Sequence, residues 1–188
     1  LAVHLQGKQS HASEPEKGIN PAMAMANITQ RFASLMNDNV NDENFALLTP
    51  VYSRMGTPAH GISAGDGELH YPIRPWSEEN MQLLKEKLLM IVADTCTTYS
   101  LQFRVDWFDF FPSAVNNKEC NELISKAAAT NGYTMKEQKV PFKFGEDFGW
   151  YTAEIKSAMF GIGAGEHSPA LHHADYDFPD AIIETGIN

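Results

Sequence analysis

The sequence is poor in cysteine and in long apolar runs. Its only cysteines, Cys96 and Cys120, have neither the CxxC spacing of a redox or zinc motif nor the density of a disulfide-stapled secreted domain. We therefore expect two reduced thiols and a cytoplasmic protein. No apolar run approaches the roughly 18 residues that span a bilayer, which argues against a membrane as the protein's environment.

Basic residues are also scarce. Lysine and arginine total 14 against 24 aspartates and glutamates, for a formal charge of -10, and this balance disfavours nucleic acid and anionic membranes as partners. With 188 residues and 43% hydrophobic content, the chain can bury a core in one or two domains. It opens inside a strand-like alternation without a methionine. We therefore expect a segment of a longer protein, or a chain that has lost a pro-region.

The first 111 residues carry the clearest periodicities. Apolar and polar positions alternate over the strands, and apolar residues recur every three or four positions over the helices. The predicted order is a strand at 2–9, a helix from Asn20-Pro21, strands at 45–55 and 68–74, a helix capped by Ser77, and a strand at 101–107. This order is that of the ferredoxin-like β-α-β-β-α-β unit, an antiparallel sheet with two helices on one face. We therefore predict an α+β fold with such a domain over residues 1–111.

The methionines at 23, 25, 81 and 90 have helical spacing, and we predict that they belong to the core. Residues 112–188 read differently, as alternating helices and strands of an α/β layer. The predicted elements are helices at 116–131, 147–155 and 179–185 and strands at 133–138 and 158–162. These elements supply too little core for a stable domain, so we expect them to complete a sheet whose other strands lie elsewhere.

Residues 144–178 concentrate the residue types of a metal site. Imidazole and carboxylate suit zinc and similar ions, and glycines let a backbone approach a substrate closely. The cluster comprises Glu146, Asp147, Gly161, Gly163, Gly165, His167, His172, His173, Asp175 and Asp177. In an extended segment His172 and His173 would point to opposite faces, so at most one of them faces a metal. A histidine that merely caps a helix or bonds a carbonyl is the alternative for each.

Two further residues are candidates outside that cluster. His11 lies beside Ser10 and Ser13, but no nucleophile elbow supports a serine hydrolase, and a solvated loop histidine is the plain alternative. Arg74 ends a predicted strand, where a guanidinium could hold a substrate carboxylate through two parallel hydrogen bonds or simply be exposed.

Taken together, five blocks of the sequence resemble the aminoacylase and hippurate-hydrolase type of dinuclear-zinc metallopeptidases and amidohydrolases. The blocks are GKQSHASEPEKGINP at 7–21, the segment 61–74, FPSAVNN at 111–117, FGEDFGWY at 144–151 and GIGAGEHSPALHHADYDFPDAI at 161–182. The resemblance implies a zinc-binding α/β catalytic domain interrupted by a ferredoxin-like lid, through which such enzymes dimerise. Residues 1–111 would be the lid, and residues 112–188 the C-terminal part of the catalytic domain.

The resemblance also implies residue roles. His172 looks like the last zinc ligand, and His11 like the lid histidine that stabilises the oxyanion in the partner subunit's site. Arg74 occupies the position that binds the substrate carboxylate, and Glu146 and Gly163 fall in blocks that line the substrate. Two departures affect recognition, because Gly145 replaces a usual serine and Gly61 stands where many relatives have an asparagine.

The implied function is hydrolysis of the amide bond in N-acyl amino acids or peptide-like molecules, with a pair of zinc ions as cofactor and manganese or cobalt as substitutes. The remaining metal ligands and the general-base glutamate of the family lie upstream of the lid, so we expect this chain alone to be inactive. The alternative is a non-catalytic dimerisation or small-molecule-binding module, because ferredoxin-like domains serve such roles on their own. A relative that has lost activity is a third reading.

Overall fold

The computed structural model describes all 188 residues, which form two compact units with a mixed α and β fold. Unit 1 comprises Leu1–Ser113 and Lys139–Gly145, and unit 2 comprises Ala114–Gln138 and Glu146–Asn188. The domain boundary predicted after residue 111 stays a prediction. None of the helices combines the length and the apolarity needed to cross a membrane.

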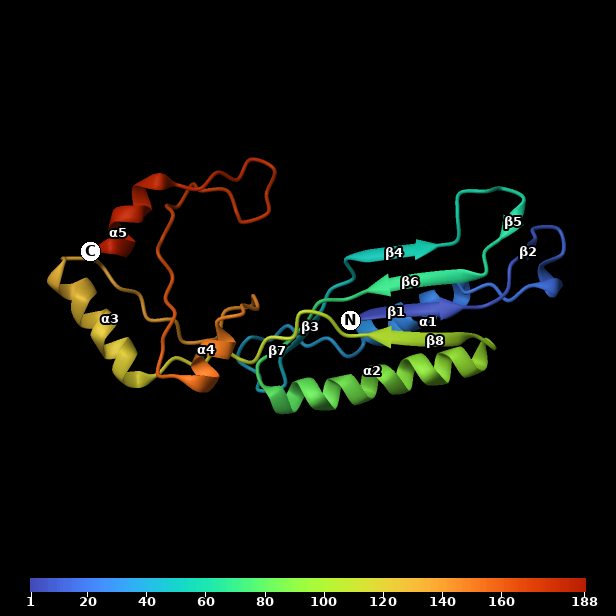
Figure 1. Ribbon diagram of the computed structural model, residues 1–188, viewed down its shortest axis with the longest axis horizontal. Coiled ribbons are helices and arrows are strands. Elements are labelled where there is room, and N and C mark those ends of the chain that lie inside the picture. The colour runs from blue at the N-terminus through green and yellow to red at the C-terminus, as the bar shows by residue number, and fades with distance from the viewer. The chain divides into compact units, whose positions relative to one another are not determined.

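Unit 1 is built on a four-stranded antiparallel sheet with the order β4-β6-β1-β8 (Figure 1). Its strands are β1 (Ala2–Gln6), β4 (Tyr52–Met55), β6 (Asp66–His70) and β8 (Gln102–Asp106). Helix α1 (Ala22–Ala33) follows β1 in the chain, and α2 (Glu78–Thr98) connects β6 to β8 by way of a short strand. The register places Val3 opposite both Leu69 and Val105.

One face of this sheet carries the core. Val3, Leu5 and Leu69 point from the strands into a cluster with both helices. The helices contribute Ala24, Met25, Ile28 and Phe32 from α1, and Leu84, Leu88, Ile91, Val92 and Cys96 from α2. The predicted apolar stripes of both helices are therefore confirmed at nearly every position. Burial raises the pKa of the Cys96 thiol to about 11, and both cysteines are free, as predicted.

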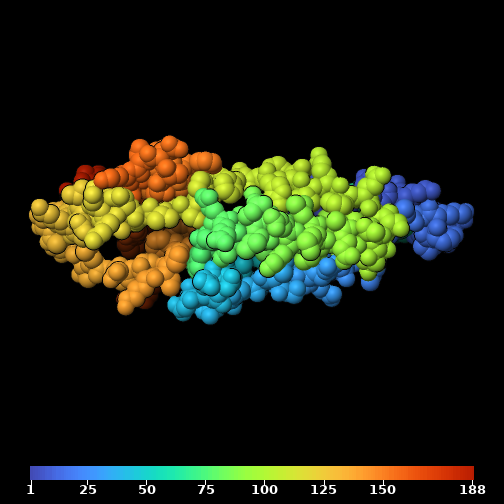
Figure 2. Space-filling view, turned by 90° about the horizontal axis from the view of Figure 1, so that it is seen from below, coloured from blue at the N-terminus to red at the C-terminus, as the bar shows by residue number.

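For two of the four methionines, the prediction that they belong to the core is wrong. Met23 and Met90 are 63% and 68% exposed, because they lie on the outward faces of their helices. Helical spacing relates residues to each other but does not say which face of the helix turns inward. The outer face of α2, in green in Figure 2, is open to solvent.

Local side-chain caps explain where the helices of unit 1 begin. Asn20 Oδ1 accepts the Ala22 N–H at 2.8 Å, with Pro21 already in helical conformation. Ser77 Oγ accepts the Asn80 N–H at 3.2 Å, and Glu78 and Glu79 lie in the first turn, where the helix dipole favours acids. The start predicted at Ser77 is confirmed, whereas α1 begins one residue later than predicted, with Pro21 as its N-cap.

Prolines divide two of the predicted strands. The strand predicted at 45–55 is split by Pro50 into β3 (Ala46–Leu48) and β4, which belong to different sheets. Pro72 likewise separates β6 from β7 (Ile73–Pro75), and β7 pairs with β3. Proline lacks the N–H that a strand ladder needs, so each break allows the chain to change sheets.

Between β4 and β6 the chain forms a short strand, β5 (Ile62–Ser63). It pairs antiparallel with β2 (Ser10–His11), which follows β1 in the chain. A single turn of 3-10 helix, Pro15–Lys17, lies between β2 and α1. The β2 and β5 pair is the element that holds His11.

Unit 2 has helices but no sheet. Its elements are α3 (Lys118–Thr130), α4 (Gly149–Glu154), a 3-10 turn at Asp180–Ile182 and α5 (Ile183–Ile187). Asn117 caps α3 by accepting the Cys120 N–H at 3.3 Å, and Gly132 follows the helix with a φ of +73°. These helices confirm the prediction, except that Gly186 lies within α5 instead of ending it.

The two strands predicted in unit 2 are wrong. Neither 133–138 nor 158–162 has a strand partner in the structure. Instead, the Asn116 side chain bonds both the N–H and the carbonyl of Met159, at 2.9 and 2.8 Å. Every buried hydrophobic side chain of the protein lies between Ala2 and Leu101, so unit 2 has no apolar core.

Candidate functional site

His11 lies at the end of β2, on a backbone that is fixed on both sides. Its register partner is Ile62 of β5, and the Ala12 N–H donates to the Gly61 carbonyl at 3.0 Å. The His11 carbonyl in turn accepts the Glu14 N–H at 2.9 Å. The imidazole is exposed and contacts Ser13 through Nδ1. An exposed ring on an ordered backbone can reach toward another molecule.

Arg74 lies in β7 and is half-buried. Its Nη1 donates to the Lys143 carbonyl at 3.2 Å. The sequence has four arginines, and the other three form ion pairs with Asp94, Asp66 and Asp106. Arg74 has no carboxylate partner in the structure. Its guanidinium therefore keeps the charge and the donors that would bind the carboxylate of a ligand.

Unit 1 does not bring His11 and Arg74 together. The β2 and β5 pair lies beyond one end of the four-stranded sheet, and the β3 and β7 pair lies beyond the other end (Figure 1). These two residues therefore cannot act on the same small molecule from within one copy of unit 1.

In unit 2, His172 has an unusual backbone. Its φ is +68°, the left-handed region that few residues other than glycine adopt. The two histidines lie in a turn, so the premise of an extended segment was wrong. The contacts of the two imidazole rings still differ. His173 Nδ1 accepts the Asp175 N–H at 3.2 Å, whereas the His172 ring has no partner in the chain. Backbone strain of this kind concentrates at functional sites.

Glu146 and Gly163 are both exposed to solvent. The Glu146 carboxylate has no hydrogen bond or ion pair, although its carbonyl lies 3.4 Å from the Gly149 N–H. A Cβ added at Gly163 would meet no atom within 4 Å, whereas Gly165 has a φ of +104° that only glycine adopts easily. Within unit 2, therefore, nothing in the fold requires glycine at position 163.

The chain alone does not form a metal centre. No group of three or more histidine, cysteine, aspartate or glutamate side chains is arranged to hold a metal ion. A zinc site needs three or four protein ligands, and a single histidine such as His172 supplies one. The donor atoms present thus fit one position of a metal site and not a complete one.

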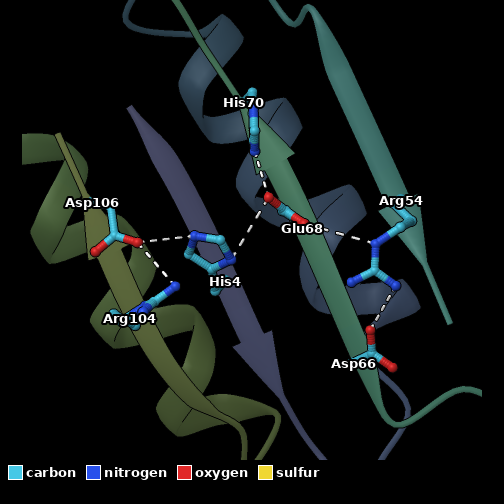
Figure 3. Close-up of polar contacts among 7 residues, drawn as sticks. All are labelled: His4, Arg54, Asp66, Glu68, His70, Arg104 and Asp106. Atoms are coloured by element: carbon cyan, nitrogen blue, oxygen red, sulfur yellow. Dashed lines mark hydrogen bonds and ion pairs between the residues drawn. The ribbon is translucent and has the colours of Figure 1, made fainter. Parts of the chain in front are cut away.

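A polar network that was not predicted from the sequence lies on the open face of the sheet in unit 1 (Figure 3). The only signal for it was the polar half of the strand alternation. Glu68 is central, with its Oε1 at 2.6 Å from His70 Nε2 and 3.7 Å from His4 Nδ1. Arg54 bridges Asp66 and Glu68 on one side, and Asp106 joins His4 and Arg104 on the other.

A shallow hollow crosses this open face, lined by His4, Gln6, Arg54, Asp66, Gln102 and Arg104 among others. It contains none of the predicted site residues. Both of its arginines are already paired with carboxylates, so the hollow offers no unpaired charge to a ligand. We interpret the network as a stabilising cluster of the sheet.

The network makes the stability of unit 1 depend on pH. The hydrogen bond from His70 has the largest effect and lowers the pKa of the Glu68 carboxyl. Burial raises this pKa, and the charges of His4, His70 and Arg54 lower it further. A carboxyl whose pKa is lower in the folded state stabilises the fold above its ordinary pKa of 4.5 and loses that contribution as the pH falls below it.

We therefore predict that Glu68→Gln lowers the free energy of unfolding at pH 7 by about 1 kcal/mol and flattens its decline at acid pH. Denaturant unfolding at pH 7, 5 and 3 measures both effects. Glu14→Gln is the control, because Glu14 forms only an exposed pair with Lys17. Equal losses for the two variants at pH 7 would contradict the role of Glu68.

Nearly the whole sequence matches a known family. Residues 7–188 match peptidase family M20/M25/M40, and the chain belongs to this family. It is 28% identical over 191 residues to an N-acetyldiaminopimelate deacetylase of Bacillus cytotoxicus. The alignment covers 100% of this chain and 49% of that protein. A deacetylase of the same name from a Geobacillus strain is also 28% identical, over 190 residues. The chain thus spans about half the length of the curated relatives it matches.

Solved structures agree on the fold. A tripeptidase from Staphylococcus aureus superposes with a TM-score of 0.70 at 18% identity, covering 88% of this chain and 43% of that one. An amidase of the hydantoinase/carbamoylase family from Burkholderia ambifaria gives a TM-score of 0.62 at 18% identity, covering 84% and 38%. At such identities the likeness establishes the fold and not the substrate.

Proposed function

We propose that this chain forms the ferredoxin-like lid and the C-terminal part of the catalytic domain of a longer metal-dependent amidohydrolase, which we call the intact protein. Its reaction is hydrolysis of the amide bond of N-acyl amino acids or similar small amides. The family match over residues 7–188 carries the proposal. The strand order β4-β6-β1-β8, with a helix before β4 and another before β8, supports the lid assignment.

Arg74 is the proposed anchor of the substrate. A half-buried guanidinium without a carboxylate partner suits the carboxylate that an N-acyl amino acid carries. Glu146 and Gly163 line the substrate from unit 2, where the absence of a side chain at position 163 lets the backbone come close.

His172 is the proposed metal ligand of this chain. Its imidazole has no partner within the chain, and the neighbouring His173 is bonded to Asp175. The other ligands and the general base would come from the rest of the intact protein. When bound there, a pair of zinc ions, or manganese or cobalt in their place, would supply an activated water and polarise the amide carbonyl.

His11 is the proposed oxyanion donor, and it acts in the active site of a second copy. The separation of His11 and Arg74 at opposite ends of unit 1 supports this arrangement, because one copy cannot bring both to one substrate. We therefore propose a cytoplasmic homodimer formed through the lid. The outer edge of β8 is unpaired in the sheet and could serve such an interface.

The direct test is an assay of free amine released from N-acetyl and N-benzoyl amino acids. The intact protein should turn over at least one of them, and the 188-residue chain alone should turn over none. A dimer that binds such molecules without hydrolysing them would instead favour a non-catalytic binding module. Turnover by the 188-residue chain alone would refute the proposal that the active site needs residues from the rest of the intact protein.

Substrate selectivity tests Arg74. We predict that Arg74→Gln lowers kcat/KM for an N-acyl amino acid by about 10- to 100-fold, mainly through a higher KM, since the loss removes hydrogen bonds to a charged group. The variant should also lose the preference for the free acid over its methyl ester. Arg104→Gln is the matched control, because Arg104 is already paired with Asp106. An unchanged preference in Arg74→Gln would contradict the anchor role.

A further inference from the structure

The ring of His11 is held by a single neighbouring residue. The Ser13 backbone N–H lies 3.2 Å from His11 Nδ1, and the Ser13 hydroxyl oxygen lies 2.7 Å from the same nitrogen. Ser13 thus contacts Nδ1 through two different groups. His11 Nε2 has no hydrogen-bond partner in the chain, and the imidazole is exposed.

These contacts determine where the imidazole proton lies. A backbone N–H can only donate, so Nδ1 must present its lone pair to it. The hydroxyl can satisfy the same arrangement by donating as well, whereas a proton on Nδ1 would face the Ser13 N–H. In the neutral ring the proton therefore lies on Nε2, the nitrogen that points away from the loop.

We propose that Ser13 is a positioning residue that fixes the Nε2–H tautomer of His11 and so prepares this ring to donate a hydrogen bond to an oxyanion. This inference rests on the proposed function of His11. A developing oxyanion needs a donor already aimed at it. The other neutral tautomer would offer the oxyanion a lone pair and would repel it.

The loop geometry supports the assignment. Ala12 and Glu14, which flank Ser13, are each tied by a backbone hydrogen bond, to Gly61 and to His11 respectively. The Ser13 N–H and hydroxyl therefore start from a fixed position. Ser10, the other serine beside His11, directs its hydroxyl toward the His11 carbonyl at 3.4 Å and does not contact the ring. The two serines make a matched pair for a test.

The tautomer can be read directly by long-range 1H–15N spectra of the protein labelled with 15N in its histidine rings, at a pH where the ring is neutral. His11→Ala identifies the signals. We expect a protonated Nε2 and an unprotonated Nδ1 in the wild type and in Ser10→Ala. Ser13→Ala keeps the backbone N–H but loses the hydroxyl, so it should show a larger share of the Nδ1–H tautomer than the wild type. Ser13→Thr, which keeps both groups, should restore the wild-type pattern. A proton on Nδ1 of the wild type would overturn the inference.

The kinetic counterpart uses the intact protein with an N-acyl amino acid. Ser13→Ala should lower kcat by about 5-fold, the effect of one neutral hydrogen bond, with KM and metal content unchanged. Ser13→Thr should recover the loss, and Ser10→Ala should show none. If kcat fell as much in Ser10→Ala as in Ser13→Ala, the positioning role of Ser13 would be overturned. Absence of any amide hydrolysis would refute the proposed function, while the spectra would still decide the tautomer.

Discussion

Replacing His11 with alanine in the intact protein is expected to lower kcat for an N-acyl amino acid by about 100-fold or more, the effect of losing one oxyanion donor. The change should leave the metal content and the fold intact, because the His11 ring is exposed and contacts only Ser13. Steady-state kinetics with metal analysis of the same samples measures both.

His60 provides the control for this prediction. It is another exposed histidine, and it directly precedes Gly61, whose carbonyl bonds the His11 loop. His60→Ala should therefore retain wild-type kcat. Unchanged turnover in His11→Ala, or an equal loss in both variants, would remove His11 from the mechanism.

The second large effect is expected for His172→Ala, which should lose metal and activity together. Mutations of residues that only orient metal ligands cost 10- to 100-fold, so removal of a ligand itself should cost at least about 100-fold in kcat. His173→Ala is the adjacent control, because its ring is bonded to the Asp175 N–H within the turn. It should keep most of the metal and the activity.

Metal analysis separates this prediction from a simple folding defect. Unit 2 has no apolar core around His172, and the residue is exposed, so alanine at this position should not unfold the chain. If His173→Ala lost the metal and His172→Ala kept it, the two assignments would have to be exchanged. If both variants kept it, neither histidine would be a ligand.

The helices and the core of unit 1 could be predicted from local chemistry. Ser77 caps α2 where the sequence indicates, Asn20 accepts the N–H of the first residue of α1, and the stripes around Phe32 and Leu88 are buried. Periodicity could not predict which helix residues face the core, since Met90 is exposed. It also could not predict that the chain passes to a different sheet at Pro50 and at Pro72. Those features depend on tertiary pairing, which a local pattern does not contain.

The strands predicted in unit 2 failed for a related reason. A strand exists only with a partner, and Met159 is bonded by the Asn116 side chain instead of by a neighbouring strand. The small number of apolar residues in the predicted elements of 112–188 did indicate that this part of the chain lacks a core of its own. Sequence periodicity can thus reveal strand-forming segments without revealing whether a partner is present.

The candidate site was predictable as residue types but not as geometry. His172 and Arg74 could be named from their motifs. The left-handed turn at His172, the missing carboxylate partner of Arg74 and the contacts of Ser13 with His11 required coordinates. The network around Glu68 was also visible only in the fold, because its members come from separate strands.

The central claim is that one chain serves two active sites, with His172 acting in its own and His11 in that of its partner. The most direct measurement mixes intact His11→Ala and His172→Ala proteins, each nearly inactive alone, under conditions in which dimers exchange subunits. Random pairing should then restore about a quarter of wild-type activity, because half of the dimers are mixed and each holds one complete site. No recovery, with exchange verified by mass spectrometry, would contradict the account.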